Sequence, residues 1–117
     1  MMATRVLVVE DSTAVRGLIV VILQRAGHQV IAVSDAGSAL DAGIGLSSSD
    51  LVICDVHLEG QSGIGLCDRL REKVPGLKIL YISGEISHPP LSEDSAFLLK
   101  PFRPEALVAK VKEMTGG

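Results

Sequence analysis

The sequence is poor in the residues that hold small secreted proteins and membrane proteins together. Its 117 residues include two cysteines, Cys54 and Cys67, which are too few for a disulfide framework, and each falls in an apolar pattern typical of a buried residue. No stretch reaches the roughly 20 uncharged apolar residues of a membrane span, and residues 1–5 lack the apolar core of a signal peptide. We therefore expect a reduced, cytoplasmic setting without membrane association.

Aromatic residues and basic charge are also scarce. One Tyr, two Phe and no Trp amount to 3% of the chain, whereas 47% of the residues are apolar, so the core must be mainly aliphatic. Eleven Lys and Arg stand against fourteen Asp and Glu, a net charge of −3. Because a nucleic-acid surface needs concentrated basic charge, we expect no direct contact with nucleic acid. The length predicts one domain over residues 1–117, with a core from about residue 5 to residue 114.

Short β-branched runs alternate with amphipathic segments along the chain. The runs favour strands at 5–9, 29–34, 51–54, 77–82 and 96–99. The segments between them favour helices after residue 12, over 36–46, over 63–74 and from Pro104 onward. The first and third runs are continuously apolar, which is typical of strands buried on both faces of a parallel sheet. This order predicts a doubly wound α/β fold with five parallel strands.

The fourth crossover between strands is short. Residues 84–96 separate Ser83 from Phe97, and they include Pro89 and Pro90. Proline lacks the N–H that a helix interior needs. We therefore expect at most a short helical turn in this crossover.

Polar residues follow four of the expected strands. Glu10 and Asp11 follow the first, Asp55 the third, and Ser83 and Lys100 lie at the ends of the fourth and fifth. Ligands of open α/β sheets bind outside these carboxyl ends. If the first and third strands are neighbours, their carboxylates converge and need a cation between them to stay ionised. Oxygen ligands alone favour a hard divalent ion, Mg²⁺ above all.

In this order and at these strand ends, the five residues resemble the receiver domain of bacterial two-component response regulators, over Arg5 to about Met114. The resemblance implies a flavodoxin-like sheet of order 2-1-3-4-5. It also implies a phosphorylation-dependent switch that changes conformation at the loops after the third and fourth strands. A histidine kinase or phosphotransfer protein would supply the phosphoryl group, and a downstream protein or output domain would respond. Such a domain assists its own phosphorylation and dephosphorylation but is not an enzyme acting on a separate substrate.

The resemblance also assigns roles around the metal. Asp11 and Asp55 would be the side-chain ligands of Mg²⁺, the carbonyl of His57 a backbone ligand, and Glu10 a further ligand directly or through water. Glu59 stands where the family commonly has proline, which makes the loop after the third strand more acidic.

Further roles concern the phosphoryl group. Asp55 would be the phosphoacceptor, Lys100 would pair with the carboxylate or phosphoryl oxygens, and Ser83 would hydrogen-bond to the phosphoryl group. Phe97 falls at the position of the switch aromatic. Because it cannot donate a hydrogen bond as tyrosine does, its rotamer change would be steric.

Two other classes of function compete with this interpretation. A degenerate receiver would keep the fold as an interaction module that works without phosphorylation, and the shortened crossover is compatible with altered output. A small phosphatase with an aspartate nucleophile usually has a second acid two residues later, where this chain has His57. A flavin-binding module fits less well, because the loop after the first strand is acidic.

Overall fold

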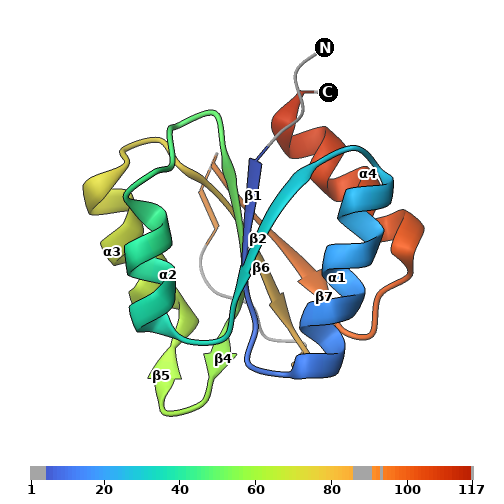
Figure 1. The fold of residues 1–117 in the computed structure, drawn as a ribbon, viewed down its shortest axis with the longest axis horizontal. Coiled ribbons are helices and arrows are strands. Elements are labelled where there is room, and N and C mark those ends of the chain that lie inside the picture. The colour runs from blue at the N-terminus through green and yellow to red at the C-terminus, as the bar shows by residue number, and fades with distance from the viewer. Residues whose placement is uncertain (1–4, 86–90, 93, 117) are drawn as a thin grey trace.

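A five-stranded parallel sheet forms the centre of the computed structural model, which describes residues 5–85, 91, 92 and 94–116 (Figure 1). Its strands are β1 (Arg5–Val9), β2 (Gln29–Val33), β3 (Leu51–Asp55), β6 (Lys78–Ser83) and β7 (Ser95–Leu99). They pair in the order β2-β1-β3-β6-β7. Because β6 and β7 are the fourth and fifth strands of this sheet, the predicted order 2-1-3-4-5 is confirmed.

Helices cover both faces of the sheet (Figure 1). One apolar cluster joins residues of β1 such as Val6 and Val8 to α1 (Thr13–Arg25) and α4 (Pro104–Thr115). The other joins Leu7 and Val9 to α2 (Ala36–Gly43) and α3 (Gly63–Lys73). Successive side chains of a strand point to opposite faces, so a central strand covered on both sides must be apolar at every position. This explains the continuous apolar runs of β1 and β3.

Side-chain caps place the starts of three helices near the carboxyl edge of the sheet. Ser12 accepts a hydrogen bond from the backbone of Val15 before α1, and Asp35 and Ser62 do the same before α2 and α3. These caps satisfy N–H groups that have no partner inside the helix. The helix α4 begins at Pro104, as predicted.

Two predicted helix ends lie further along the chain than the observed ones. The helix α2 ends at Gly43 instead of continuing to residue 46, because Gly45 and Leu46 donate to the carbonyls three residues back in a tighter turn. The helix α3 ends at Lys73, one residue before its predicted end.

The connection between β3 and α3 has more structure than the plain loop expected after the third strand. It contains a small antiparallel hairpin of β4 (His57–Leu58) and β5 (Gln61–Ser62). Residues 86–90 and 93 of the fourth crossover lie outside the described residues, so the expectation of at most a short helical turn there stays a prediction. Within the described ranges no helix is long and apolar enough to cross a membrane.

The cap of α2 makes the stability of the fold depend on pH. Hydrogen bonds from the backbone and hydroxyl of Ser38 lower the pKa of Asp35 below its ordinary value. A carboxyl group whose pKa is lowered by folding stabilises the fold above its unfolded-state pKa, and this contribution is lost as the pH falls through the folded-state pKa.

We therefore expect Asp35→Asn, which keeps a capping oxygen but no charge, to flatten the pH dependence of stability. Between about pH 5 and about pH 2, the wild type should lose more of its free energy of unfolding than the variant. Urea unfolding at a series of pH values measures both. Parallel curves would contradict the assignment of this charge to the cap.

Candidate functional site

Three carboxylates meet where β1 and β3 end side by side. Val9 and Cys54 pair in the register of these strands, so Glu10 and Asp55 follow at neighbouring positions. One carboxylate oxygen from each of Glu10, Asp11 and Asp55 lies within 4.8 Å of the others. Glu10 is fully buried and Asp55 is 6% exposed. The predicted convergence of these acids is therefore confirmed, and two of them lie beneath the surface.

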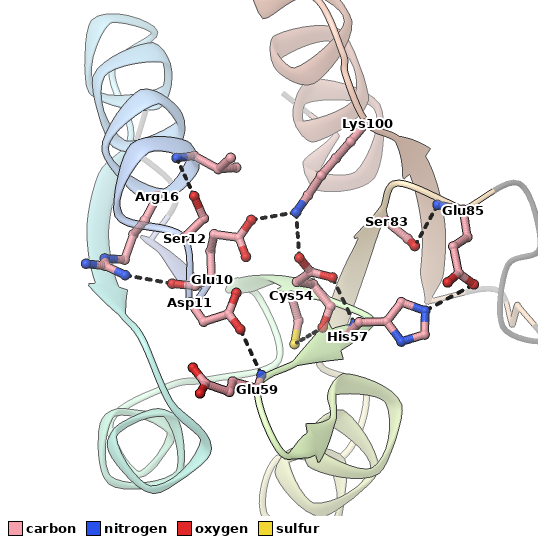
Figure 2. A network of polar contacts seen from close by, with 12 residues as sticks. Glu10, Asp11, Ser12, Arg16, Cys54, His57, Glu59, Ser83, Glu85 and Lys100 are labelled. Atoms are coloured by element: carbon pink, nitrogen blue, oxygen red, sulfur yellow. Dashed lines mark hydrogen bonds and ion pairs between the residues drawn. The ribbon is translucent and has the colours of Figure 1, made fainter.

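The ammonium group of Lys100 lies between two of the carboxylates (Figure 2). Its Nζ is 2.6 Å from Oε1 of Glu10 and 2.5 Å from Oδ2 of Asp55. Lys100 directly follows β7, and its backbone N–H donates to the carbonyl of Ser83 at 2.7 Å. From the far side of β6, its side chain therefore reaches across the edge of the sheet to β3 and β1.

Burial and charge act against each other in this group. Burial raises the pKa of Glu10 above its ordinary value and so does neighbouring Asp55, while the hydrogen bond from Lys100 only partly opposes them. Burial alone would lower the pKa of Lys100, but its hydrogen bonds to Asp55 and Glu10 outweigh this effect, and its pKa is raised. Lys100 therefore stays charged at neutral pH, and one positive charge serves two carboxylates.

The residues present fit a divalent cation. The Oε2 atom of Glu10 is buried and has no hydrogen-bond partner, a costly state for a carboxylate oxygen. Asp11 lies beside it at the edge of the cluster, with Oδ2 held by the backbone N–H of Glu59 at 2.8 Å. A cluster of carboxylate oxygens with one unsatisfied buried atom matches the ligand preference of Mg²⁺ and its bound water.

The phosphoacceptor candidate is held from two sides. The backbone N–H of His57 donates to Oδ1 of Asp55 at 2.8 Å, opposite Lys100 on Oδ2. The imidazole of His57 points away and forms an exposed pair with Glu85, 3.3 Å between Nε2 and Oε2 (Figure 2). His57 thus lies against Asp55 through its backbone, while the role of its carbonyl as a metal ligand stays a prediction.

Ser83 and Phe97 lie in different surroundings. Ser83 ends β6 and is 1% exposed, one position beyond Ile82, which pairs with Asp55 in the sheet. Its hydroxyl accepts the N–H of Glu85 at 3.1 Å. Phe97 pairs with Tyr81 in the sheet and packs, partly buried, against the apolar cluster beneath α2 and α3. The structure therefore places Ser83 at the strand end beside Asp55, and Phe97 at the margin of the core.

A contact that the sequence analysis missed is the close approach of Gly63 to Asp55. A Cβ atom on Gly63 would lie 1.9 Å from the carbonyl oxygen of Asp55 and 3.1 Å from Sγ of Cys54. The N–H of Gly63 also donates to the carbonyl of Val56 at 2.8 Å. The first residue of α3 is thus packed directly against the backbone of the candidate nucleophile. Gly63 begins the helix predicted over 63–74, and a glycine at a helix start carries no signal of such a contact.

The cysteines have the structural role predicted for them. Cys54 and Cys67 are both fully buried, and neither forms a disulfide. Two effects raise the pKa of Cys54 far above its ordinary value: a hydrogen bond with Cys67, which is the larger, and burial. Its thiol therefore stays neutral beside Asp55 and adds no charge to the site.

Comparison with known proteins gives a consistent result. A sequence model of the response regulator receiver domain matches residues 6–112. The protein is 36% identical over 115 residues to the "Uncharacterized transcriptional regulatory protein YrkP" of Bacillus subtilis (strain 168), covering 94% of this chain and 48% of YrkP. It is 30% identical over 116 residues to the "DNA-binding response regulator MtrA" of Mycobacterium tuberculosis (strain CDC 1551 / Oshkosh), covering 95% and 50%. The chain thus spans about half the length of these relatives.

Solved structures share the whole fold. The receiver domain from the hybrid histidine kinase CckA superposes with a TM-score of 0.83 at 28% identity, covering 95% of this chain and 98% of that one. The chemotaxis response regulator CheY4 of Vibrio cholerae gives a TM-score of 0.82 at 26% identity, covering 97% and 99%.

Because Gly63 lies so close to the backbone of Asp55, we expect its substitution to destabilise the fold strongly. We expect Gly63→Ala to lose several kcal/mol of stability, because its methyl group has to displace backbone atoms rather than a flexible side chain. Gly65→Ala is the matched control, since its Cβ would meet nothing closer than 3.9 Å, and it should gain up to about 1 kcal/mol from helix propensity. Urea unfolding measures both, and equal stabilities would contradict the close approach.

Proposed function

This chain belongs to the family of response regulator receiver domains, and we propose that it is a signalling switch that accepts a phosphoryl group on Asp55. The observation that carries the proposal is the arrangement of Asp55, with one carboxylate oxygen on the ammonium of Lys100 and the other on a backbone N–H. A carboxylate held this way has both oxygens fixed and an ammonium group beside it, so it is oriented for attack on phosphorus.

The proposed chemistry needs little beyond position and charge. A carboxylate oxygen of Asp55 attacks phosphorus, the bond from phosphorus to the donor breaks with its electron pair on the leaving group, and an acyl phosphate forms. Lys100 moves from neutralising the carboxylates to pairing with phosphoryl oxygens. Preorganised positive charge of this kind lowers the barrier because it is in place before charge develops on the phosphoryl group.

We further propose that Mg²⁺ binds at the acidic cluster. Asp11 and Asp55 would hold it by their side chains, His57 by its backbone carbonyl, and Glu10 directly or through water. The buried, unpartnered Oε2 of Glu10 supports this proposal. When bound, the ion supplies charge neutralisation for the incoming phosphoryl oxygens.

The switch would begin at Ser83. Its hydroxyl accepts the N–H of Glu85, which leaves the hydroxyl proton to donate to a phosphoryl oxygen on Asp55. Moving this hydroxyl would carry the chain after β6 with it. The loop after β3 would follow, because the N–H of Val56 donates to the carbonyl of Ile82 at 2.9 Å. Phe97 would respond sterically from β7. Such a change depends on different contacts in the two states.

The phosphoryl donor would be a histidine kinase or a phosphotransfer protein. Such a donor would dock on α1, the helix that starts beside Asp11. Two apolar side chains one turn apart on this helix are exposed, Leu18 at 51% and Val21 at 44%. A downstream protein or output domain would respond to the modified state.

The name of MtrA mentions DNA binding, so the comparisons do not support the expectation that nucleic acid is not involved. Two expectations stay predictions: residues 1–117 form one receiver domain, and this domain makes no DNA contacts of its own.

A phosphatase is less consistent with the site. The residue two positions after Asp55 is His57, whose imidazole lies against Glu85 at the surface rather than on Asp55. A degenerate receiver remains the second candidate for output, although the acidic, hydroxyl and lysine positions of the family pattern are all filled.

The proposal predicts a covalent adduct. After incubation with Mg²⁺ and acetyl phosphate, intact-protein mass spectrometry should show one added phosphoryl group on the wild type. Asp55→Asn should show none, because an amide cannot form the acyl phosphate. If no adduct forms, a beryllofluoride complex distinguishes a short-lived phosphate from an inactive site. Absence of both, or an adduct on Asp55→Asn, would refute the assignment of Asp55.

Lys100 should be needed for the chemical step beyond its contribution to the stability of the buried carboxylates. We expect Lys100→Ala to keep the circular dichroism spectrum of the wild type but to be phosphorylated about 100-fold more slowly, as when one preorganised donor is lost from an active site. Lys112→Ala removes an exposed lysine of α4 and should leave the rate unchanged. Equal rates for both variants would exclude the proposed role of Lys100.

A further inference from the structure

We propose that the backbone N–H of Glu59 positions Asp11 for binding of the metal ion, which makes Glu59 a positioning residue of the site. The inference rests on the proposed function, since it concerns the same Mg²⁺ ligand. It arises from one contact across the molecule: the N–H of Glu59 donates to Oδ2 of Asp11 at 2.8 Å, although the two residues are 48 positions apart (Figure 2).

The contact determines the orientation of the Asp11 carboxylate. Its Oδ2 is taken by the backbone, and no described residue donates a hydrogen bond to Oδ1. Glu10 and Asp55, by comparison, are each held by Lys100. Asp11 makes no ion pair with a described residue, so the N–H of Glu59 is the contact that orders its carboxylate. Partners that orient a metal ligand typically affect metal affinity by about 10- to 100-fold.

The contact depends on which residue occupies position 59. Leu58 and Gln61 pair in the β4–β5 hairpin, so Glu59 and Gly60 are its two turn residues. Gly60 has φ of +72°, whereas Glu59 has negative φ, the combination of a type II turn. Proline is common at the first central position of that turn, but it has no N–H to donate. A chain with proline at this position would keep the hairpin and lose the contact with Asp11.

The Glu59 carboxylate acts separately from its N–H. Glu59 lines a cavity of about 440 Å³ together with Asp11 and Asp35, and none of the three is in an ion pair with a described residue. Its charge therefore adds to the attraction for a cation through space, which salt screens. The hydrogen bond is a local contact that salt leaves largely unchanged, so the two effects can be separated by ionic strength.

Two substitutions at one position test the inference. Glu59→Gln removes the charge and keeps the N–H, whereas Glu59→Pro removes both and suits the turn. With Mg²⁺ alone, we expect Glu59→Gln to bind about twofold more weakly at low salt and like the wild type at high salt. We expect Glu59→Pro to bind about 10-fold more weakly at both. Isothermal titration measures the dissociation constants, and Asp11→Ala is the variant without binding.

A second measurement needs no metal. In the wild type and in Glu59→Gln, the amide resonance of residue 59 should lie downfield and move upfield when Asp11→Ala is added. Equal Mg²⁺ affinities of Glu59→Pro and Glu59→Gln at high salt would overturn the inference, as would an amide resonance unaffected by Asp11→Ala. If wild-type protein binds no Mg²⁺, the proposed metal site fails first, and the amide measurement still decides whether the contact exists.

Discussion

Two carboxylates buried side by side are the constraint on which the rest of this structure depends. Glu10 and Asp55 lie at the ends of adjacent central strands, out of water, where two negative charges repel each other strongly. The ammonium of Lys100 contacts both and makes the pair tolerable. Because one positive charge serves two acids, the group is left short of positive charge. This shortage of positive charge is the basis for the proposals that a further cation, and then a phosphoryl group, bind here.

The fold supplies this arrangement from distant parts of the chain. Lys100 has to come from the strand beyond β6, and its backbone is fixed there by a hydrogen bond to Ser83. Below the carboxylates, the first residue of α3 is packed so closely on Asp55 that only glycine fits. Above them, Asp11 is held by the hairpin between β4 and β5. The acids are thus held by two connections, the backbone of the one from β3 to α3 and the Lys100 side chain of the one after β7.

Much of this could be predicted from local patterns. The continuous apolar runs of β1 and β3 indicated strands covered on both faces, and the polar residues that end them identified the acids of the site. The predicted ends of α2 and α3 were less accurate than the predicted strands. The tighter turn after Gly43, for example, depends on individual backbone hydrogen bonds. The contact between Glu59 and Asp11 could not be predicted, because a backbone N–H is present at almost every position and carries no sequence signal. Phe97 is assigned to a switch by resemblance alone, and its partly buried position against the core neither supports nor contradicts that role.

By itself, the sequence determined which residues stand at the ends of strands and which side chains must be buried, because both follow from periodicity over a few neighbouring residues. Only the tertiary structure decided which strand ends lie next to each other. The pairing of Lys100 with Glu10 joins residues 90 positions apart. It depends on how two helical layers pack on one sheet, and that packing involves the whole chain. The same packing left one oxygen of Glu10 buried without a partner, a property of the assembled site that no single segment contains.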